Sequence, residues 1–187
     1  MCAGIPVSDT SGAVRDALPL LGGQLARFQA AYPVWSKFAA GFMLLFTGMC
    51  AGRITIRYNL YTVGTCLPIP LYAIVACGIA TGGNYLAGFA ASMLLALATK
   101  NYCRAFCNGY GFDAIFRASL YLGLMPLVYA PALPLLLLLP LAVLLFRRTF
   151  REVVVATAGL LLPIFTACYV SWGSGAEFTA PLVTVGQ

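Results

Sequence analysis

Residues 34–57 read VWSKFAAGFMLLFTGMCAGRITIR. The run is apolar from Val34 to Gly52, apart from a few polar side chains near its start, and it ends in two basic residues, Arg53 and Arg57. A long apolar run followed by arginines is typical of a membrane-spanning helix whose basic end faces the cytoplasm. This stretch decides the fold, because the rest of the chain repeats its pattern.

The chain has six apolar runs of this kind. Several are nearer about 15 residues than 20, which is short for a hydrocarbon core of about 30 Å, and snorkelling Lys and Arg side chains make up the difference. The turns without charge are tight, so we expect the runs to pair as helical hairpins. The sequence therefore predicts an all-α, polytopic membrane bundle of about six transmembrane helices in three hairpins, at approximately 34–52, 60–79, 85–99, 112–130, 132–146 and 153–172.

Basic residues occupy only every second gap between these runs. They lie at 53–57, 100–117 and 147–151, whereas the gaps around 82–84 and 129–134 carry no charge. Loops rich in Lys and Arg face the cytoplasm in multi-pass membrane proteins. The pattern predicts a protein of the bacterial inner membrane with these three loops on the cytoplasmic side and both chain ends on the other side.

The two terminal segments differ from the apolar runs. Polar residues interrupt 1–33 too often for a span, while Leu18, Leu21, Leu25 and Phe28 recur at helical spacing. This spacing predicts an amphipathic helix at the membrane interface. We therefore divide the chain into an N-terminal interfacial segment (1–33), a transmembrane domain (34–172) and a short C-terminal tail (173–187).

Composition excludes several classes of protein. Hydrophobic residues make up 61% of the chain and charged residues 9%, whereas about a quarter of a soluble domain is charged. The excess of basic residues lies in short turns, which favours contact with anionic lipid headgroups over nucleic acid. The chain has no histidine, and most of its seven cysteines lie inside apolar runs, so we predict neither a metal site nor a cofactor.

Two acidic residues are placed where they could act in catalysis. Asp113 lies at the start of the fourth run, four residues before Arg117, and Glu152 lies four residues after Arg148. An acid at the membrane–cytoplasm boundary could act as a base toward a lipid-linked phosphate. The alternative, which we favour, is that Asp113 stabilises the helix start and neutralises Arg117 through an i,i+4 ion pair.

Six basic residues surround these acids in the sequence and are candidates for binding phosphate or lipid headgroups. Arg147 and Arg151 are four apart, so they share one helix face and could clamp a phosphate. The alternative is that such clusters only anchor a turn against anionic headgroups. The candidates are Lys100, Arg104, Arg117, Arg147, Arg148 and Arg151.

Several motifs together resemble a known family. The segments are Arg53-Ile-Thr-Ile-Arg-Tyr-Asn-Leu60, Leu67-Pro-Ile-Pro-Leu-Tyr72, Gly111-Phe-Asp-Ala-Ile-Phe-Arg-Ala-Ser-Leu-Tyr-Leu-Gly123, Tyr129-Ala-Pro131, Phe150-Arg-Glu152 and Gly159-Leu-Leu-Leu-Pro163. Over roughly 35–172 the chain resembles an uncharacterised multi-pass inner-membrane family of Bacteroidota that carries a domain-of-unknown-function label. Family members have an additional helix before and further helices after this region, so the resemblance implies a shortened member or part of a longer protein. It implies location and topology, and no reaction.

Two functions follow as hypotheses. The first is a non-catalytic subunit of a cell-envelope assembly, which has the lipid bilayer and other membrane proteins as partners and is favoured by the scarcity of charge in the apolar runs. The alternative is an enzyme or carrier that acts on a lipid-linked phosphate or glycan, with polyprenyl phosphate or an anionic lipid as its ligand. A solute transporter is less favoured, since no run carries a mid-membrane ionisable residue.

Overall fold

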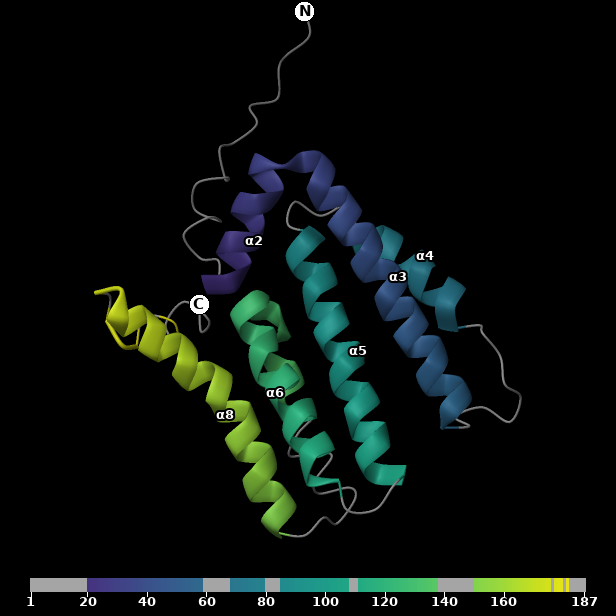
Figure 1. The fold of residues 1–187 in the computed structure, drawn as a ribbon. Coiled ribbons are helices and arrows are strands. Elements are labelled where there is room, and N and C mark those ends of the chain that lie inside the picture. The colour runs from purple at the N-terminus through teal and green to yellow at the C-terminus, as the bar shows by residue number, and fades with distance from the viewer. Residues whose placement is uncertain are drawn as a thin grey trace, which may run out of the picture.

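The chain forms a bundle of helices (Figure 1). The computed structural model describes residues 20–58, 68–79, 85–107, 111–137, 150–175, 177–179 and 181. Within these residues there is no strand, so the all-α prediction is confirmed. The helices are α2 (Leu20–Ala31), α3 (Pro33–Arg57), α4 (Pro68–Ile79), α5 (Tyr85–Cys107), α6 (Phe112–Val128), the 3-10 helix η1 (Ala130–Leu137) and α8 (Phe150–Gly173).

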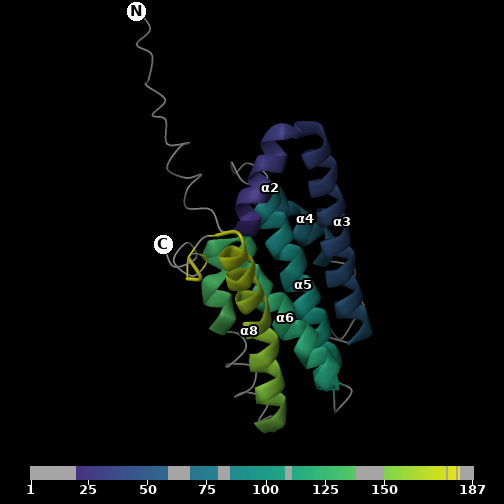
Figure 2. The same ribbon diagram turned by 60° about the vertical axis from the view of Figure 1, so that its left-hand side comes forward.

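The long helices run between two ends of the bundle. α3 and α5 both descend to the lower end in Figure 1, where α6 and α8 begin, and the view in Figure 2 agrees. The descent of α3 begins at Pro33, whose fixed backbone angle and missing N–H suit the first position of a helix. Four helix ends with their polar backbone groups therefore meet at the lower end.

Small residues let α4 approach α3 closely. Gly48 and Gly52 face α4, and a Cβ on Gly52 would lie 2.9 Å from Cδ1 of Ile69. Ala40 and Ala76, nearer the upper end, belong to one buried cluster. The pairing of 52 with 69 and of 40 with 76 makes α4 antiparallel to α3, and the Gly-x-x-x-Gly spacing at 48 and 52 serves as a packing surface.

A second close contact joins α6 and α8. A Cβ on Gly159 would lie 2.8 Å from the carbonyl oxygen of Phe116, and a Cβ on Gly123 would collide with the carbonyl oxygen of Leu160. Because 159 meets 116 while 123 meets 160, the two helices run in the same direction. The bare backbone at both glycines brings the helices into direct contact.

Pairs of hydroxyl groups connect α5 to each of its neighbours. Tyr85 on α5 is hydrogen-bonded to Ser36 on α3 (2.7 Å), and Tyr72 on α4 to Ser92 on α5 (2.9 Å). The third pair joins Tyr102 on α5 to Ser119 on α6 at 3.4 Å. Hydrogen bonds between helices favour one packing arrangement where apolar contacts alone would allow several. They make α5 the centre of the bundle.

The amphipathic segment predicted over 1–33 contains α2, and its first 19 residues lie outside the described part. α2 folds back over the upper end of the bundle rather than standing apart from it (Figure 1). Leu25 packs against the cluster around Phe89, and the backbone N–H of Leu86 donates to Oε1 of Gln29 at 3.4 Å. α2 therefore covers the N-terminal end of α5 and satisfies one of its unpaired amides.

Two described helices, α3 and α8, are long and apolar enough to cross a membrane, so the prediction of about six such helices is too high for the described residues. α4 has 12 residues and α6 has 17, which makes both shorter than a full crossing of about 30 Å. α5 has 23 residues, but its second half carries polar side chains, among them Lys100, Asn101 and Arg104. α5 is longer than the predicted run at 85–99, whereas α6 ends two residues before the predicted residue 130.

The run predicted at 132–146 also differs from expectation. Its described part belongs to the 3-10 helix η1, and residues 138–146 lie outside the described part. Pro131 and Pro134 explain the tighter winding, because each lacks an N–H and its ring crowds the preceding turn. The pairing differs as well: α6 packs most extensively on α5 and α8, whereas α4 and α5, on either side of an uncharged gap, touch far less.

Candidate functional site

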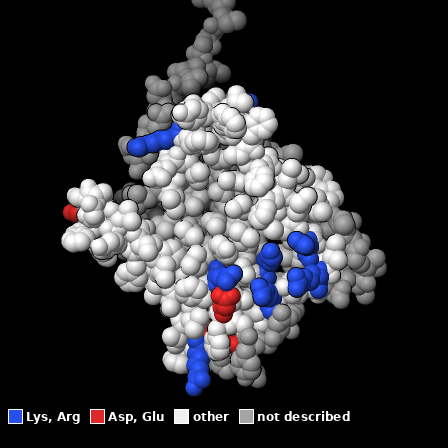
Figure 3. Space-filling view, in the orientation of Figure 1, with Lys and Arg blue, Asp and Glu red and all other residues white. Residues whose placement is uncertain are grey.

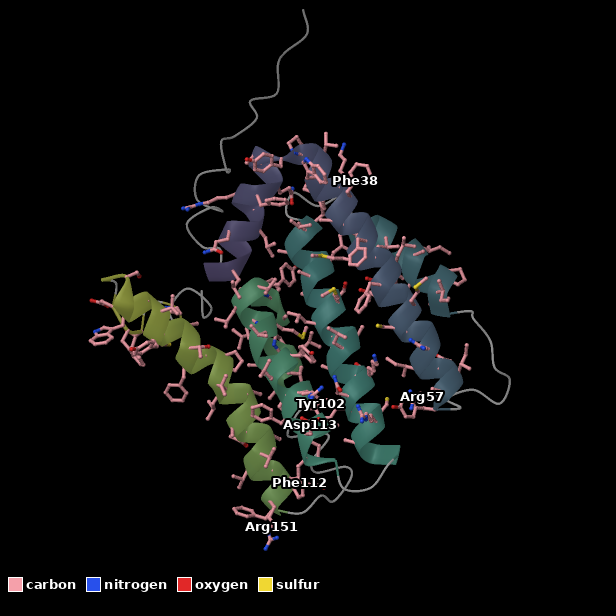
Figure 4. All side chains as sticks on the ribbon, in the orientation of Figure 1. Phe38, Arg57, Tyr102, Phe112, Asp113 and Arg151 are labelled. Carbon is pink, nitrogen blue, oxygen red and sulfur yellow. The ribbon has the colours of Figure 1, made fainter. Side chains whose placement is uncertain are left out.

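Basic side chains gather at the lower end of the bundle. Arg53 and Arg57 lie in the last two turns of α3, Lys100 and Arg104 in the C-terminal part of α5, and Arg151 in the first turn of α8. Figure 4 shows Arg57, Asp113 and Arg151 in this half of the molecule. We name it the basic end. Arg117, in the second turn of α6, belongs to it as well. The two remaining described cations, Arg27 and Lys37, belong to α2 and the start of α3 at the opposite end.

Five of the cations at this end lie near one another on one side of the bundle (Figure 3). Figure 3 shows them side by side across the lower ends of α3, α5 and α6. All five side chains are exposed, and each helix contributes from one face because its members are four residues apart. We name this surface the basic patch, and it consists of Arg53, Arg57, Lys100, Arg104 and Arg117.

One carboxylate lies within the basic patch. Oδ1 of Asp113 accepts a hydrogen bond from Nε of Arg117 at 3.0 Å, and the two side chains are 70% and 59% exposed. The predicted i,i+4 ion pair is therefore present. Within the described residues no ion pair is recorded for Arg53, Arg57, Lys100 or Arg104, so the patch retains an excess of positive charge.

Asp113 has the surroundings of a surface carboxylate. It lies in the first turn of α6, where the helix dipole favours a negative charge, although no side-chain hydrogen bond caps this helix. The carboxylate is 70% exposed and already engaged by Arg117, so the described residues form no enclosed site around it.

Glu152, the second predicted acid, lies in a different environment. It belongs to the first turn of α8 and is only 2% exposed. Asp113 and Glu152 share the basic end, because α6 and α8 both begin there, yet one carboxylate faces solvent and the other is buried.

The predicted phosphate candidates are only partly brought together. Lys100, Arg104 and Arg117 share the basic patch, whereas Arg151 lies on α8, lower in Figure 4 than Asp113. Arg147 and Arg148 fall outside the described residues, and the clamp predicted from Arg147 and Arg151 stays a prediction. Arg53 and Arg57 were assigned only to topology, although their i,i+4 spacing matches that of Lys100 and Arg104. That shared spacing of four residues was the feature of the sequence that could have identified Arg53 and Arg57 as part of the basic patch.

A partly buried phenol, that of Tyr102, lies behind the patch. Burial raises the pKa of Tyr102, and the hydrogen bond with Ser119 lowers it by a smaller amount. The phenol therefore stays protonated at physiological pH and keeps the hydroxyl contact between α5 and α6. Since α5 carries Lys100 and Arg104 and α6 carries Arg117, this contact helps to position the basic patch.

The described residues contain no group of three His, Cys, Asp or Glu side chains that could hold a metal ion. Comparison with known proteins gives no further guide to the chemistry. No family model, no curated protein and no solved structure matches the chain.

Proposed function

We propose that the chain is a multi-pass protein of the bacterial inner membrane, with its basic end in the cytoplasm, and that it serves as a non-catalytic subunit of a cell-envelope assembly. The observation that carries this proposal is the exposure of α3 and α8. Only 39% of the most apolar window of α3 is buried, and only 22% of that of α8. The core helix of a soluble protein is mostly buried, and such exposed apolar faces suit lipid or a membrane partner.

The ends of both helices support a membrane placement. Trp35 on α3 and Trp172 on α8 are exposed at the end opposite the basic one. At 1.5 Å per residue, Trp35 lies about 27 Å from Arg53 along α3, and Trp172 about 31 Å from Arg151 along α8. These spacings match a hydrocarbon core of about 30 Å with aromatic anchors at one face and cations at the other.

The same placement accommodates the shorter helices. α5 and α6 pack between α3 and α8 in the two views, and α4 packs on α3, so their limited length would be met by protein neighbours as well as lipid (Figures 1 and 2). We propose that these helices lie within the membrane beside the two long ones, with the loops 53–57, 100–117 and 147–151 in the cytoplasm. The resemblance to the inner-membrane family of Bacteroidota favours the same topology.

The surroundings of the acids favour a subunit over an enzyme. Asp113 is exposed and paired with Arg117, and Glu152 is buried. An apolar surface as large as those of α3 and α8 is a feature of proteins that associate within the membrane. We therefore place the interaction with partner proteins on the apolar faces and not on the basic end.

The alternative is an enzyme or carrier acting on a lipid-linked phosphate. The basic patch beside Asp113 favours it, because several cations next to a carboxylate could bind a phosphate and activate a nucleophile. Asp113→Asn separates the two functions, with Arg27→Gln as a control distant from the patch. We expect the Asn variant to keep growth, protein level and assembly unchanged. Loss of function at normal protein level and assembly would favour the enzyme.

The direct test is purification of the full chain from native membranes in a mild detergent, followed by protein mass spectrometry. We expect a stoichiometric membrane-protein partner. A parallel preparation of an unrelated membrane protein of similar size identifies non-specific proteins. Recovery of the chain alone, with a co-purifying polyprenyl phosphate, would contradict the subunit hypothesis.

A further inference from the structure

One face of α3 changes from apolar to cationic along its length. Phe42, Phe46 and Met49 are exposed, and Arg53 and Arg57 follow on the same face because the spacings are three or four residues. The apolar part leads from the middle of the helix to the basic patch. A molecule that follows this face would need an apolar body and an anionic head, which is the chemistry of an acidic lipid.

The basic patch contains two similar pairs of cations that have no ion-pair partner among the described residues. Arg53 and Arg57 lie one turn apart on α3, and Lys100 and Arg104 lie one turn apart on α5, so each pair spans about 5–6 Å, the width of a phosphate with its hydrogen bonds. α3 and α5 pack directly, and packed helices have axes about 8–10 Å apart. The patch therefore offers two phosphate positions separated by a short gap.

We propose that the basic patch binds an anionic phospholipid with two phosphodiester groups joined by a short linker, as in diphosphatidylglycerol. One phosphate lies on Arg53 and Arg57 and the other on Lys100 and Arg104, while the acyl chains follow Phe42, Phe46 and Met49. This inference rests on the membrane placement proposed above. It adds a ligand and assigns Arg53 and Arg57 to its binding.

Two features favour this lipid over other phosphorylated ligands. The phosphates of a diphosphate share one oxygen, so they lie too close together to occupy positions on two separate helices. A phospholipid with one phosphate would fill one pair and leave the other with uncompensated charge. Arg117, the member of the patch on α6, is already paired with Asp113, so the patch offers no third phosphate position there.

The test is a lipid titration of the purified, delipidated full chain in detergent, followed by native mass spectrometry. The probes are diphosphatidylglycerol, phosphatidylglycerol, a polyprenyl diphosphate and inorganic diphosphate. We expect diphosphatidylglycerol to bind at least about tenfold more tightly than phosphatidylglycerol. The reason is that it contacts two more cations, each of which strengthens binding. Inorganic diphosphate should not displace it, because it lacks the acyl chains.

Two double variants locate the site. Arg53→Gln with Arg57→Gln, and separately Lys100→Gln with Arg104→Gln, should each weaken diphosphatidylglycerol binding by about tenfold and remove its advantage over phosphatidylglycerol. Arg27→Gln with Lys37→Gln removes the same charge at the opposite end and should leave binding within about twofold. All six side chains are exposed, so folding is not at risk, and circular dichroism verifies this.

Several outcomes would overturn the inference. Equal weakening of binding in the Arg27 and Lys37 control would show that binding depends on net charge alone. Tighter binding of polyprenyl diphosphate would assign the patch to a carrier lipid. Displacement of the lipid by inorganic diphosphate would assign the patch to a free anion. Fractionation of cells separates this failure from that of the proposed function. A chain found in membranes without lipid preference contradicts only the lipid site, whereas a chain outside membranes contradicts both.

Discussion

At the level of single residues, the bundle depends on positions where a side chain is absent or carries a hydroxyl. Gly123 and Gly159 allow α6 and α8 to touch. Three serines form the hydrogen bonds with tyrosines that join α5 to α3, α4 and α6, namely Ser36, Ser92 and Ser119. Neither kind of residue contributes much apolar area. In the membrane placement proposed above, they determine which arrangement of similar apolar helices is adopted, because lipid solvates leucine as well as another helix does.

Gly159→Ala is therefore expected to destabilise the protein. The added Cβ would press on the backbone oxygen of Phe116, which cannot move without shifting α6. We expect a loss of about 1–3 kcal/mol in the free energy of unfolding, measured by SDS titration with circular dichroism. Gly41→Ala is the matched control, since nothing lies within 4 Å of its Cβ, and it should be neutral or slightly stabilising. Equal effects of the two variants would contradict the close contact.

The bond between Tyr85 and Ser36 should be measurable in a double-mutant cycle. We expect Tyr85→Phe and Ser36→Ala to show a coupling free energy of about 0.6 kcal/mol, within an upper bound of about 1.7, because the two hydroxyls are 2.7 Å apart. The same SDS titration provides the values. Tyr129→Phe combined with Ser36→Ala is the control, and additive effects in the Tyr85 cycle would show that the contact does not stabilise the fold.

At the level of helices, the predicted and observed boundaries agree where a proline or arginines mark the end of an apolar run, and they differ where no such residue marks it. Pro33 and the arginines at 53 and 57 mark the limits of α3, and the predicted run at 34–52 lies inside it. The pattern could not distinguish a spanning α5 from a helix that continues past Lys100 into polar residues. It also missed the 3-10 winding of η1, because apolar content hides the effect of Pro131 and Pro134.

A crossing of the membrane by α3 predicts that its two ends react on opposite sides. In a background with the seven native cysteines replaced, Lys37→Cys should react with an impermeant maleimide in intact cells, whereas Arg57→Cys should react only after lysis. Both positions are exposed, so protein burial does not explain a difference. Equal labelling of both sites in intact cells would contradict the crossing.

For the whole molecule, the clearest property is the unequal charge of its two ends. The sequence predicted that alternate loops would share one end, and α3, α5, α6 and α8 do place the described cations of these loops together. It could not predict that Arg53 and Arg57 would lie beside Lys100 and Arg104, nor that Glu152 would be buried. Those facts depend on how helices distant in the sequence pack.

This charge difference should govern orientation. A green fluorescent protein fused after Gln187 is expected to be dark in wild-type cells, because it would be exported unfolded, and to fluoresce in a variant in which Arg53, Arg57, Lys100 and Arg104 are all replaced by Gln. The measurement is fluorescence per unit of fusion protein on a blot. Replacement of Arg27 and Lys37 by Gln is the control and should stay dark. Fluorescence in the wild type would contradict the proposed topology.

The parallel contact of α6 with α8 has a consequence for biogenesis. Gly123 meets Leu160 and Pro163, so its partner surface is translated about 40 residues later, which takes about 2–8 s at about 5–20 residues per second. During this interval the glycine face of α6 is already synthesised but cannot be covered by its own chain. In the membrane placement proposed above, lipid or the insertion machinery occupies it first. The docking of α8 is therefore a displacement reaction and a late step of assembly.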